Sequence, residues 1–480
     1  MNKKTNINSW VATSPLIFFI LLLAYGLFIH PMLYEKERLP VEVLVIMATS
    51  FSIILLMWKG YTWEHIQANI TKKVGESVPV IMILLAIGVL IGSWIVSGTI
   101  PMLIYHGISL INPDWIYIFS FLICIIFSLL TGTSWGSAGT IGIVMMGIAQ
   151  IYHADLFITA GAIVGGSFFG DKMSPLSDTT NIASLATDVP LFDHIRSMMY
   201  TTFPSAIIAG LIYIILSPAI QGNAAEGAIR LEQIEETLSG LESIFSFNIL
   251  LLIPLVVAIY GSVTKKPIFI TLLVSAWIAM LLAMIFQSFS FTDIFNSFNK
   301  GFSTEMAAVE GINSDVLAIL NRGGLYNLID GVVISFLIFV FIGTLQVMDS
   351  IQVAIDSLMG GLKKQSHTVM AALTTTAFTN LTTSNQYATS FVIGEAFKDK
   401  FDKLKIPRRV LSRSIEDAGT MLENLAPWTP SGIFMASTLG VTSLQYAPYQ
   451  FMSLINILIA YILAMTGIGC FFNEHKATDE

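Results

Sequence analysis

The segment GDKMSPLSDTTN occupies residues 170–181 and interrupts an otherwise apolar stretch that runs from residue 156 to residue 186. Its proline lacks a backbone donor and clashes with the preceding turn, so one half-helix should end before it and another begin after it. A second stretch, residues 409–439, is interrupted in the same way by GTMLENLAPWTP at residues 419–430. We therefore expect two helices that are each broken in the middle.

The composition around these segments is that of a polytopic membrane protein. Of the 480 residues, 54% are hydrophobic and only 12% are charged, which is about half the charge content of soluble proteins. A membrane-spanning helix needs about 20 mostly apolar residues, and we expect the first such stretch to be a retained span because it is longer than a signal-peptide core. The expected spans are residues 14–33, 41–58, 78–96, 201–216, 244–260, 267–287, 331–347 and 448–472.

Two polar tips indicate hairpins that enter the membrane and return on the same side. Residues 115–152 carry Thr133 and Ser134 between two apolar arms, and residues 366–398 carry Thr383, Ser384 and Asn385. Irregular backbone at bilayer depth is tolerated only where it is buried in protein or lines a wet cavity. The alternative of twelve or more simple spans leaves these tips unexplained.

The two halves of the chain have the same order of elements: two spans, a third span, a hairpin, a broken span and a last span. The halves are residues 1–217 and 244–480, joined by an acidic linker at residues 218–243. Because each half has five spans, the second copy must be inserted upside down. The expected fold is an all-α polytopic membrane protein of two inverted repeats, each with five transmembrane helices and one re-entrant hairpin. Inverted repeats with helices broken at the midplane are typical of secondary transporters; chance similarity of two Gly-, Ser- and Thr-rich stretches is the alternative.

Positive charge predicts the orientation of these spans. If the N-terminus is cytoplasmic, most of the 24 Lys and Arg residues flank the cytoplasmic face, including the cluster from Lys398 to Arg413. Both termini are then cytoplasmic, and the linker, with Glu226, Glu232, Glu235 and Glu236, lies outside. For the outer segment 288–330 we expect partly helical packing at an interface.

Ionisable groups in the first broken helix point to a cation site. Such groups cost roughly 2.5–3.5 kcal/mol each at bilayer depth, so they are expected to be paired or functional. Asp171 and Lys172 could form a structural ion pair. Asp178 has no cationic neighbour in sequence and stands beside Ser177 and Thr179, and such hard oxygen donors suit small hard cations.

The expected binding residues come from both tips and both breaks. The exposed carbonyls where a half-helix ends also favour a cation, although small and hydroxyl residues can instead serve only close helix packing. We expect the Na⁺ ion at Asp178, Ser134 and Asn385. The full ion- or substrate-binding set is Thr133, Ser134, Asp171, Ser177, Asp178, Thr179, Thr383, Ser384, Asn385, Glu423, Asn424 and Thr429, with Lys172 as charge partner.

A buried carboxylate supplies a mechanism for exchange. If burial disfavours the charged form of Asp178, a proton and Na⁺ compete for the same oxygens. Loss of the proton creates the cation site, and release of the cation restores the proton. Glu423 is a second candidate proton site, whereas Glu416 and Asp417 could pair with Arg413.

Other classes of function have little support in the sequence. The net charge of −8 argues against nucleic-acid binding. Cys124 and Cys470 lie in separate apolar segments and indicate neither a disulfide framework nor a zinc site. No HExxH or GxSxG motif points to an enzyme, and we expect no cofactor beyond Na⁺ and H⁺ as coupled ions. A channel is an alternative that could not drive uphill accumulation.

The strings GTSWGSAGTIG at residues 132–142 and GDKMSPLSDTTN at 170–181, with NLAPWTP at 424–430, resemble those of the NhaC family of bacterial Na⁺/H⁺ antiporters. The resemblance covers nearly the whole chain and implies the ion-transporter superfamily architecture in the bacterial cell membrane, with a scaffold region that is often dimeric. It implies Na⁺/H⁺ exchange as the activity.

The resemblance leaves the substrate open, because similar proteins include malate/lactate antiporters and amino-acid carriers. Exchange of a small carboxylate or amino acid, coupled to Na⁺ and H⁺, is therefore the alternative. Lys172 could counter an organic anion, and Asn385, Gln386 and Trp428 would suit a ligand larger than an ion.

Overall fold

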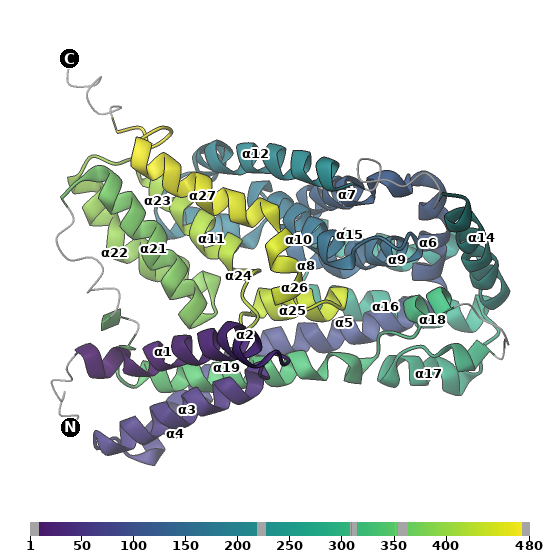
Figure 1. Cartoon of the computed structure of the whole chain (residues 1–480), viewed down its shortest axis with the longest axis horizontal. Coiled ribbons are helices and arrows are strands. Elements are labelled where there is room, and N and C mark those ends of the chain that lie inside the picture. Colours follow the sequence, from purple (N-terminus) through teal and green to yellow (C-terminus); the bar gives the residue numbers. More distant parts are fainter. Residues whose placement is uncertain are drawn as a thin grey trace.

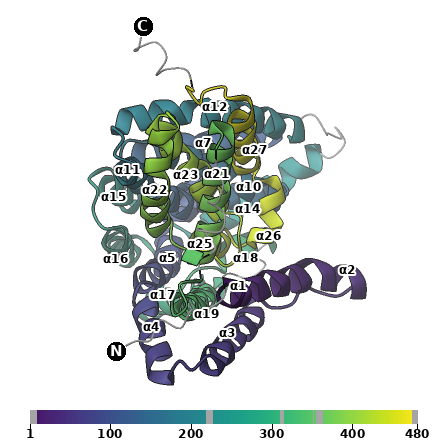
Figure 2. The ribbon, with the colours of Figure 1, turned by 90° about the vertical axis from the view of Figure 1, so that its left-hand side faces the viewer.

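The protein is described by a computed structural model covering residues 9–217, 227–307, 309, 314–350, 352–353 and 363–472, and this part of the chain is helical without strands. The long helices run side by side along the long axis of the molecule (Figure 1). Viewed from its left-hand end, α1 to α4 and α19 form a group below most of the remaining helices (Figure 2). Helix α1 begins, and α27 ends, at this same end of the molecule.

The first part of the chain supplies α1 to α4 of the lower group and one hairpin-like pair of helices, α7 and α9. The Tyr117 hydroxyl accepts a hydrogen bond from the Asp155 backbone (3.0 Å). Tyr117 is near the start of α7 and Asp155 follows α9, so the start of α7 and the end of α9 lie at the same level. The helices are α1 (Ser9–Ala24), α2 (His30–Tyr34), α3 (Val41–Trp58), α4 (Trp63–Gly75), α5 (Val78–Val96), α6 (Thr99–Leu110), α7 (Ile116–Thr131), α8 (Ser134–Ser137), α9 (Ile143–Ile151), α10 (Leu156–Met173), α11 (Asp178–Ala186) and α12 (Leu191–Leu216).

The second part contains another such pair, α21 and α22. The Gln365 side chain donates a hydrogen bond to the Leu404 carbonyl (2.9 Å), which joins the start of α21 to the residue after α22. The helices are α14 (Gly227–Ile244), α15 (Ile253–Val263), α16 (Ile268–Phe286), α17 (Phe291–Lys300), α18 (Ser314–Leu320), α19 (Ile329–Gln346), α21 (Gln365–Thr383), α22 (Gln386–Lys403), α23 (Arg408–Ile415), α24 (Met421–Glu423), α25 (Pro430–Leu439), α26 (Ser443–Tyr446) and α27 (Phe451–Thr466).

Seven helical stretches in the described part are long and apolar enough to cross a membrane, and nine if each of two bent pairs is one span. The coarse fold, an all-α multi-pass membrane protein, is therefore confirmed. One of the seven, Pro113–Thr131, contains the first arm of the expected hairpin. The seven are Trp10–Tyr34, Val41–Trp58, Val78–Val96, Pro113–Thr131, Leu191–Leu216, Ile268–Phe286 and Leu325–Gln346.

The expected span at residues 244–260 begins later than the hydropathy suggests. Helix α14 ends at Ile244, and the chain bends by 100° before the next helical segment. The Asn248 side chain accepts a hydrogen bond from the Leu250 backbone (2.9 Å), which caps the new segment. Of the expected acidic linker, residues 227–243 belong to α14, whereas Glu226 lies outside the described residues.

The segment 288–330 packs against α5 through glycines. The Gly324 backbone donates to the Gly88 carbonyl (2.7 Å), and Gly324 has a φ of +88°, which favours glycine. A Cβ atom at Gly92 would lie 2.1 Å from the Ser297 carbonyl oxygen. Only a residue without a side chain allows this approach of α17 to α5.

Replacing Gly92 with Ala is expected to destabilise the protein by about 1–3 kcal/mol, because backbone atoms must move apart. The matched control is Gly75→Ala at the end of α4, where a Cβ would meet nothing within 4 Å. The measurement is the thermal unfolding midpoint of the purified protein in detergent. Equal midpoints for the two variants would contradict the close packing of α5 and α17.

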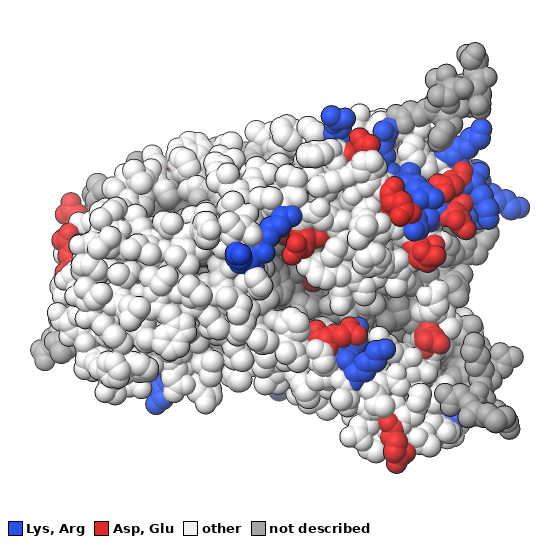
Figure 3. Space-filling view, turned by 180° about the vertical axis from the view of Figure 1, so that it is seen from behind, with Lys and Arg blue, Asp and Glu red and all other residues white. Residues whose placement is uncertain are grey.

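Charged side chains gather at one end of the surface, and a wide uncharged face covers much of the rest (Figure 3). At the charged end, Asp188 forms ion pairs with Lys398 (3.1 Å) and Arg408 (2.9 Å), and Arg408 also pairs with Asp402 (2.7 Å). These pairs tie the loop after α11 to the ends of α22 and α23. The uncharged face is the surface that a bilayer can cover.

Candidate functional site

The turn between α7 and α8 lies directly on the break between α10 and α11. Gly132 ends α7 with a φ of +70°, and a Cβ there would lie 2.5 Å from the Cβ of Leu176. Helix α10 ends at Met173 and α11 begins at Asp178, so residues 174–177 form the break around Pro175. This contact brings the polar turn to the carboxylates of the first broken helix.

Asp171 is the buried carboxylate at this contact. Its Oδ2 accepts hydrogen bonds from the Ser134 backbone (3.1 Å) and from the Ser134 hydroxyl (2.7 Å). Ser177 caps α11 by accepting from the Thr180 backbone (3.4 Å), and its hydroxyl contacts Thr179 Oγ1 at 3.1 Å. Thr133 caps α8 by accepting from the Gly136 backbone (3.2 Å). One carboxylate and several hydroxyl oxygens therefore meet where helices end.

Asp178 lies at the other side of the break, as the first residue of α11, and is exposed on the described chain. Its charge is within electrostatic range of both Asp171 and Tyr387, the second residue of α22. Helix α11 packs along α22, and a Cβ at Gly394 would lie 2.4 Å from the Ala186 carbonyl oxygen. The start of the second hairpin's return arm is thus near the first broken helix.

The second polar turn is organised by side chains of its own hairpin. Ser384 adopts a left-handed conformation (φ 48°), and its buried hydroxyl has no hydrogen-bond partner in the described part of the chain. Asn385 caps α22 by accepting from the Ala388 backbone (2.9 Å), and Thr383 contacts the Thr389 hydroxyl (3.1 Å). Gln386 accepts a short hydrogen bond from Asn380.

Glu423 is the last residue of α24, directly before the second break at residues 424–429. It is buried, and Ser431 and Asn380 lie close to it. The Trp135 indole donates to the Ser431 hydroxyl (3.3 Å), so the first turn also reaches this carboxylate's neighbour. The Trp135 ring stacks on Phe434 with centroids 4.3 Å apart.

Asn424 and Thr429 have structural contacts within the second half. The Asn424 amide donates to Ser453 (3.1 Å) and accepts from Gln450 (3.0 Å), both near the start of α27. Thr429 donates to the Glu423 carbonyl and accepts from the Gly432 backbone (3.2 Å), which caps α25. These bonds join the second break to the starts of α25 and α27.

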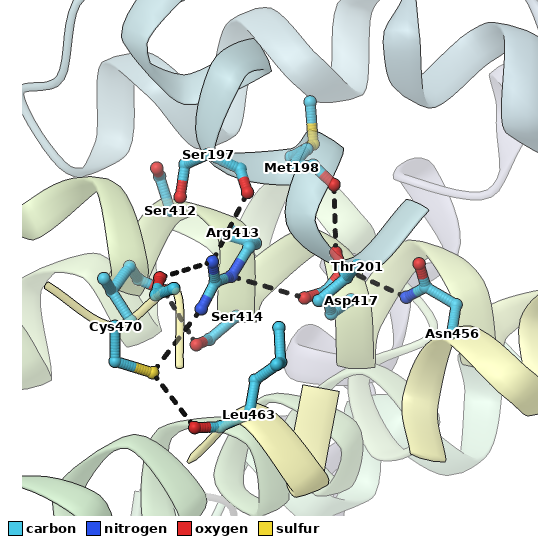
Figure 4. A network of polar contacts seen from close by, with 12 residues as sticks. Ser197, Met198, Thr201, Ser412, Arg413, Ser414, Asp417, Asn456, Leu463 and Cys470 are labelled. Atoms are coloured by element: carbon cyan, nitrogen blue, oxygen red, sulfur yellow. Dashed lines mark hydrogen bonds and ion pairs between the residues drawn. The ribbon is translucent and has the colours of Figure 1, made fainter. Parts of the chain in front are cut away.

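Lys172 forms its ion pair with Asp417, not with its neighbour Asp171. Both members are fully buried, and the pair joins the two broken helices across 245 residues of sequence. The same Asp417 oxygen accepts from Thr201 (2.8 Å) and Asn456 (2.9 Å), the contacts drawn in Figure 4. Asp417 is thus the principal counter-charge of Lys172, and Arg413 shares it.

Arg413 lies one turn before Asp417, with its Nε 3.8 Å from the second Asp417 oxygen (Figure 4). Its guanidinium also donates to the carbonyls of Gly469 (2.8 Å) and Ser197 (3.3 Å). The sequence left open whether Glu416 and Asp417 pair with Arg413, and of the two it is Asp417 that does. The network ties α12, α23 and the chain after α27 together.

The structure thus separates the expected residues into groups. Ser134, Asp171, Ser177 and Thr179 meet at the first break with Asp178 nearby. Glu423 lies at the second break, and the residues 383–385 hold the second turn. Residues that the site set did not include are Asn380, Gln386, Trp135, Ser431 and Tyr387; of these, Gln386 and Trp135 have a sequence signal, their place in the two polar turns.

Comparisons with known proteins agree on one family. The profile of the Na⁺/H⁺ antiporter family matches residues 166–468. An uncharacterized Na⁺/H⁺ antiporter of Haemophilus influenzae is 38% identical over 95% of this chain and 96% of its own. The Na⁺/H⁺ antiporter NhaC of Alkalihalophilus pseudofirmus is 32% identical over 90% and 91%, and the malate-2H⁺/Na⁺-lactate antiporter of Bacillus subtilis is 31% identical over 96% and 95%.

Proposed function

Because the chain belongs to the Na⁺/H⁺ antiporter family, as the resemblance of its motifs predicts, we propose that it exchanges Na⁺ for H⁺ across a bacterial cell membrane by alternating access. The observation that carries the proposal is the buried Asp171 carboxylate, which accepts hydrogen bonds from the backbone and the hydroxyl of Ser134 where a polar turn touches a helix break. Broken helices that present oxygen ligands are a device by which secondary transporters hold coupling ions.

The proposed Na⁺ site lies between Asp171 and Asp178. Two ionised carboxylates within electrostatic range repel each other, so either a proton or a cation between them is favoured. Na⁺ prefers oxygen ligands, and Ser134, Ser177 and Thr179 supply hydroxyls at this place. Competition between the proton and Na⁺ for these two carboxylates would produce exchange. Asn385 would enter the site only through a movement of the second turn, because its side chain caps α22.

The proposed architecture consists of two inverted repeats, residues 1–217 and 244–480, with re-entrant hairpins at 115–152 and 366–398. Equivalent contacts that the two hairpins make with the two broken helices support this architecture. Each turn lies on the break of its own half, through Gly132 on Leu176 and through the Leu381 carbonyl, which accepts from the Trp428 indole (2.9 Å). Each hairpin also contacts the broken helix of the other half, through Trp135 on Phe434 and through α22 on α11.

The proposed placement has both termini in the cytoplasm, and the proposed assembly is a homodimer. The described ends of the chain lie at the same end of the molecule as α22 and α23, the helices that carry Lys398 and Arg408 (Figure 1). Clustered positive charge of this kind stays on the cytoplasmic side.

The alternative, coupled exchange of a small carboxylate or amino acid, has less support in the geometry. It needs a cation to bind the organic anion, and Lys172 is buried and paired with Asp417. The relative from Bacillus subtilis is named for malate and lactate, so this alternative belongs in the transport assay.

The test is Na⁺ transport by the wild-type protein reconstituted into liposomes with an acidic interior. For one-to-one exchange, a gradient of one pH unit is expected to accumulate Na⁺ about tenfold without any organic solute. Protein-free liposomes are the control. Uptake that requires added malate, lactate or an amino acid would favour the alternative, and equilibration without accumulation would contradict antiport.

A further inference from the structure

Glu416 is a buried carboxylate without hydrogen-bond donors. It is fully buried, and neither of its oxygens has a hydrogen-bond partner in the described part of the chain. Two other buried carboxylates of the broken helices differ, because Asp171 accepts from Ser134 and Asp417 accepts from Thr201. Glu416 therefore needs a different explanation.

Glu416 lies in a π-helical turn, Glu416–Thr420, between α23 and α24. Single π-helical turns within longer helices frequently occur at functional sites, because they redirect side chains at the cost of regular hydrogen bonds. The turn also contacts the second hairpin, since Gln386 donates to the Ile415 carbonyl (3.5 Å) and a Cβ at Gly419 would lie 2.4 Å from Gln386 Oε1. Glu416 thus lies in a turn that contacts the polar turn of the second hairpin, so a change in the protonation of Glu416 would occur close to that polar turn.

The charged and titratable groups near Glu416 come from several helices. Lys172 and Asp171 on α10 and the neighbouring Asp417 are within electrostatic range of it, and so is Tyr387 on α22. Arg413 lies one turn earlier and already contacts Asp417. Lys172 directly follows Asp171 on α10, and its ammonium pairs with Asp417, the residue after Glu416, so this cation joins the segments that carry both carboxylates.

A carboxylate that is buried without donors is unstable as an ion, because no group replaces its lost hydration. In the conformation described, Glu416 is therefore expected to carry a proton. If Glu416 loses its proton, a nearby positive charge must stabilise the carboxylate, and Lys172 is the nearby cation that can do so.

Resting on the proposed function, we propose that Glu416 is a second proton-binding site, separate from the Na⁺ site at Asp171 and Asp178 and coupled to it through Lys172. When Glu416 is ionised, its negative charge offsets Lys172 and favours Na⁺ beside Asp171. When Glu416 takes up a proton, the Lys172 charge is less compensated and opposes Na⁺ binding. By linkage, Na⁺ binding must lower the proton affinity of Glu416 by the same factor.

The experiment measures protons released when Na⁺ binds to purified protein in weakly buffered detergent solution, together with the Na⁺ dissociation constant between pH 6 and pH 9. If Glu416 is coupled as proposed, Glu416→Gln is expected to release up to about one proton fewer per Na⁺ than wild type. Its Na⁺ dissociation constant is expected to lose the matching part of its pH dependence while Na⁺/Na⁺ exchange in liposomes persists. Glu242→Gln, which removes one charge from an exposed position on α14, is the matched control and is expected to behave as wild type.

A second variant covers the case in which Glu416→Gln does not fold. Glu416→Asp keeps the carboxyl group and is expected to shift the pH dependence of Na⁺ binding without abolishing proton release. Unchanged proton release in Glu416→Gln, or an unshifted pH profile in Glu416→Asp, would overturn the proposal. If wild-type protein itself neither binds Na⁺ nor releases protons, the proposed Na⁺/H⁺ exchange fails instead, so the two failures are distinguishable.

Discussion

Replacing Asp171 with Asn is expected to raise the Na⁺ concentration needed for half-maximal transport about 100-fold. The substitution keeps the shape of the side chain and removes the charge that, in the proposed site, attracts the cation. Loss of a charged partner for a bound group is worth about 3 kcal/mol, which corresponds to a factor of about 100 in affinity. The measurement is the Na⁺ dependence of uptake into acid-loaded liposomes.

Asp178→Asn tests the other carboxylate of the proposed site in the same assay. Because Asp178 is exposed whereas Asp171 is buried, its effect is expected to be in the same direction and smaller. Asp114→Asn removes a charge from an exposed residue before α7 and serves as the control.

Ser134→Ala separates ion binding from simple positioning of the first turn. It removes the hydroxyl that bonds to Asp171 (2.7 Å) and leaves the carboxylate. If Asp171 only holds the turn in place, Asp171→Asn and Ser134→Ala should reduce thermal stability alike and leave the Na⁺ dependence of transport unchanged. That result would contradict the proposed role of Asp171.

Replacing Asp417 with Leu is expected to destabilise the protein by about 3–5 kcal/mol, because it leaves the Lys172 ammonium buried without a counter-charge. Lys172→Met is expected to cost less, since Asp417 keeps Arg413, Thr201 and Asn456 as partners. The double variant Lys172→Met/Asp417→Leu is expected to recover part of the loss, because neither charge is then left unpaired. Thermal unfolding in detergent measures all three.

The matched control for the buried pair is a surface pair on α12. Arg196 and Asp193 are 3.9 Å apart and exposed, so Asp193→Ala is expected to change stability by less than about 1 kcal/mol. A coupling energy near zero in the double-mutant cycle of Lys172 and Asp417 would show that the pair does not link the two halves.

Much of the site's local geometry depends on short-range rules that a sequence carries. Pro175 cannot continue α10, and Gly132 can adopt the left-handed conformation that ends α7. Membership of the antiporter family was also readable, because the motifs at residues 132–142 and 170–181 are long and contiguous, and the match to the family confirms it. The division into inverted repeats remains a proposal that the pairing of contacts supports.

The chain order alone did not reveal which charges meet. Lys172 stands beside Asp171 in sequence, which makes a local pair the simplest expectation. On a helix, however, adjacent residues point about 100° apart, and pairs form between residues three or four positions apart or with other helices. Packing of α10 against α27 and the turn after α23 brings Asp417 to Lys172 and leaves Asp171 to the hydroxyl groups of the first turn.

By itself the sequence determined the membrane-embedded helical class, the positions of the helix breaks and the family, because apolar length, proline and contiguous motifs act over a few residues. The tertiary structure alone decided that Asp417 neutralises Lys172, that the buried Glu416 has no hydrogen-bond donor in the described part of the chain, and that Asn424 bonds to Ser453 and Gln450. These outcomes depend on which helix faces lie together across more than 200 residues of chain. Desolvation and pairing are properties of that packed neighbourhood, and they decide which of the buried charges can exchange a proton or a cation.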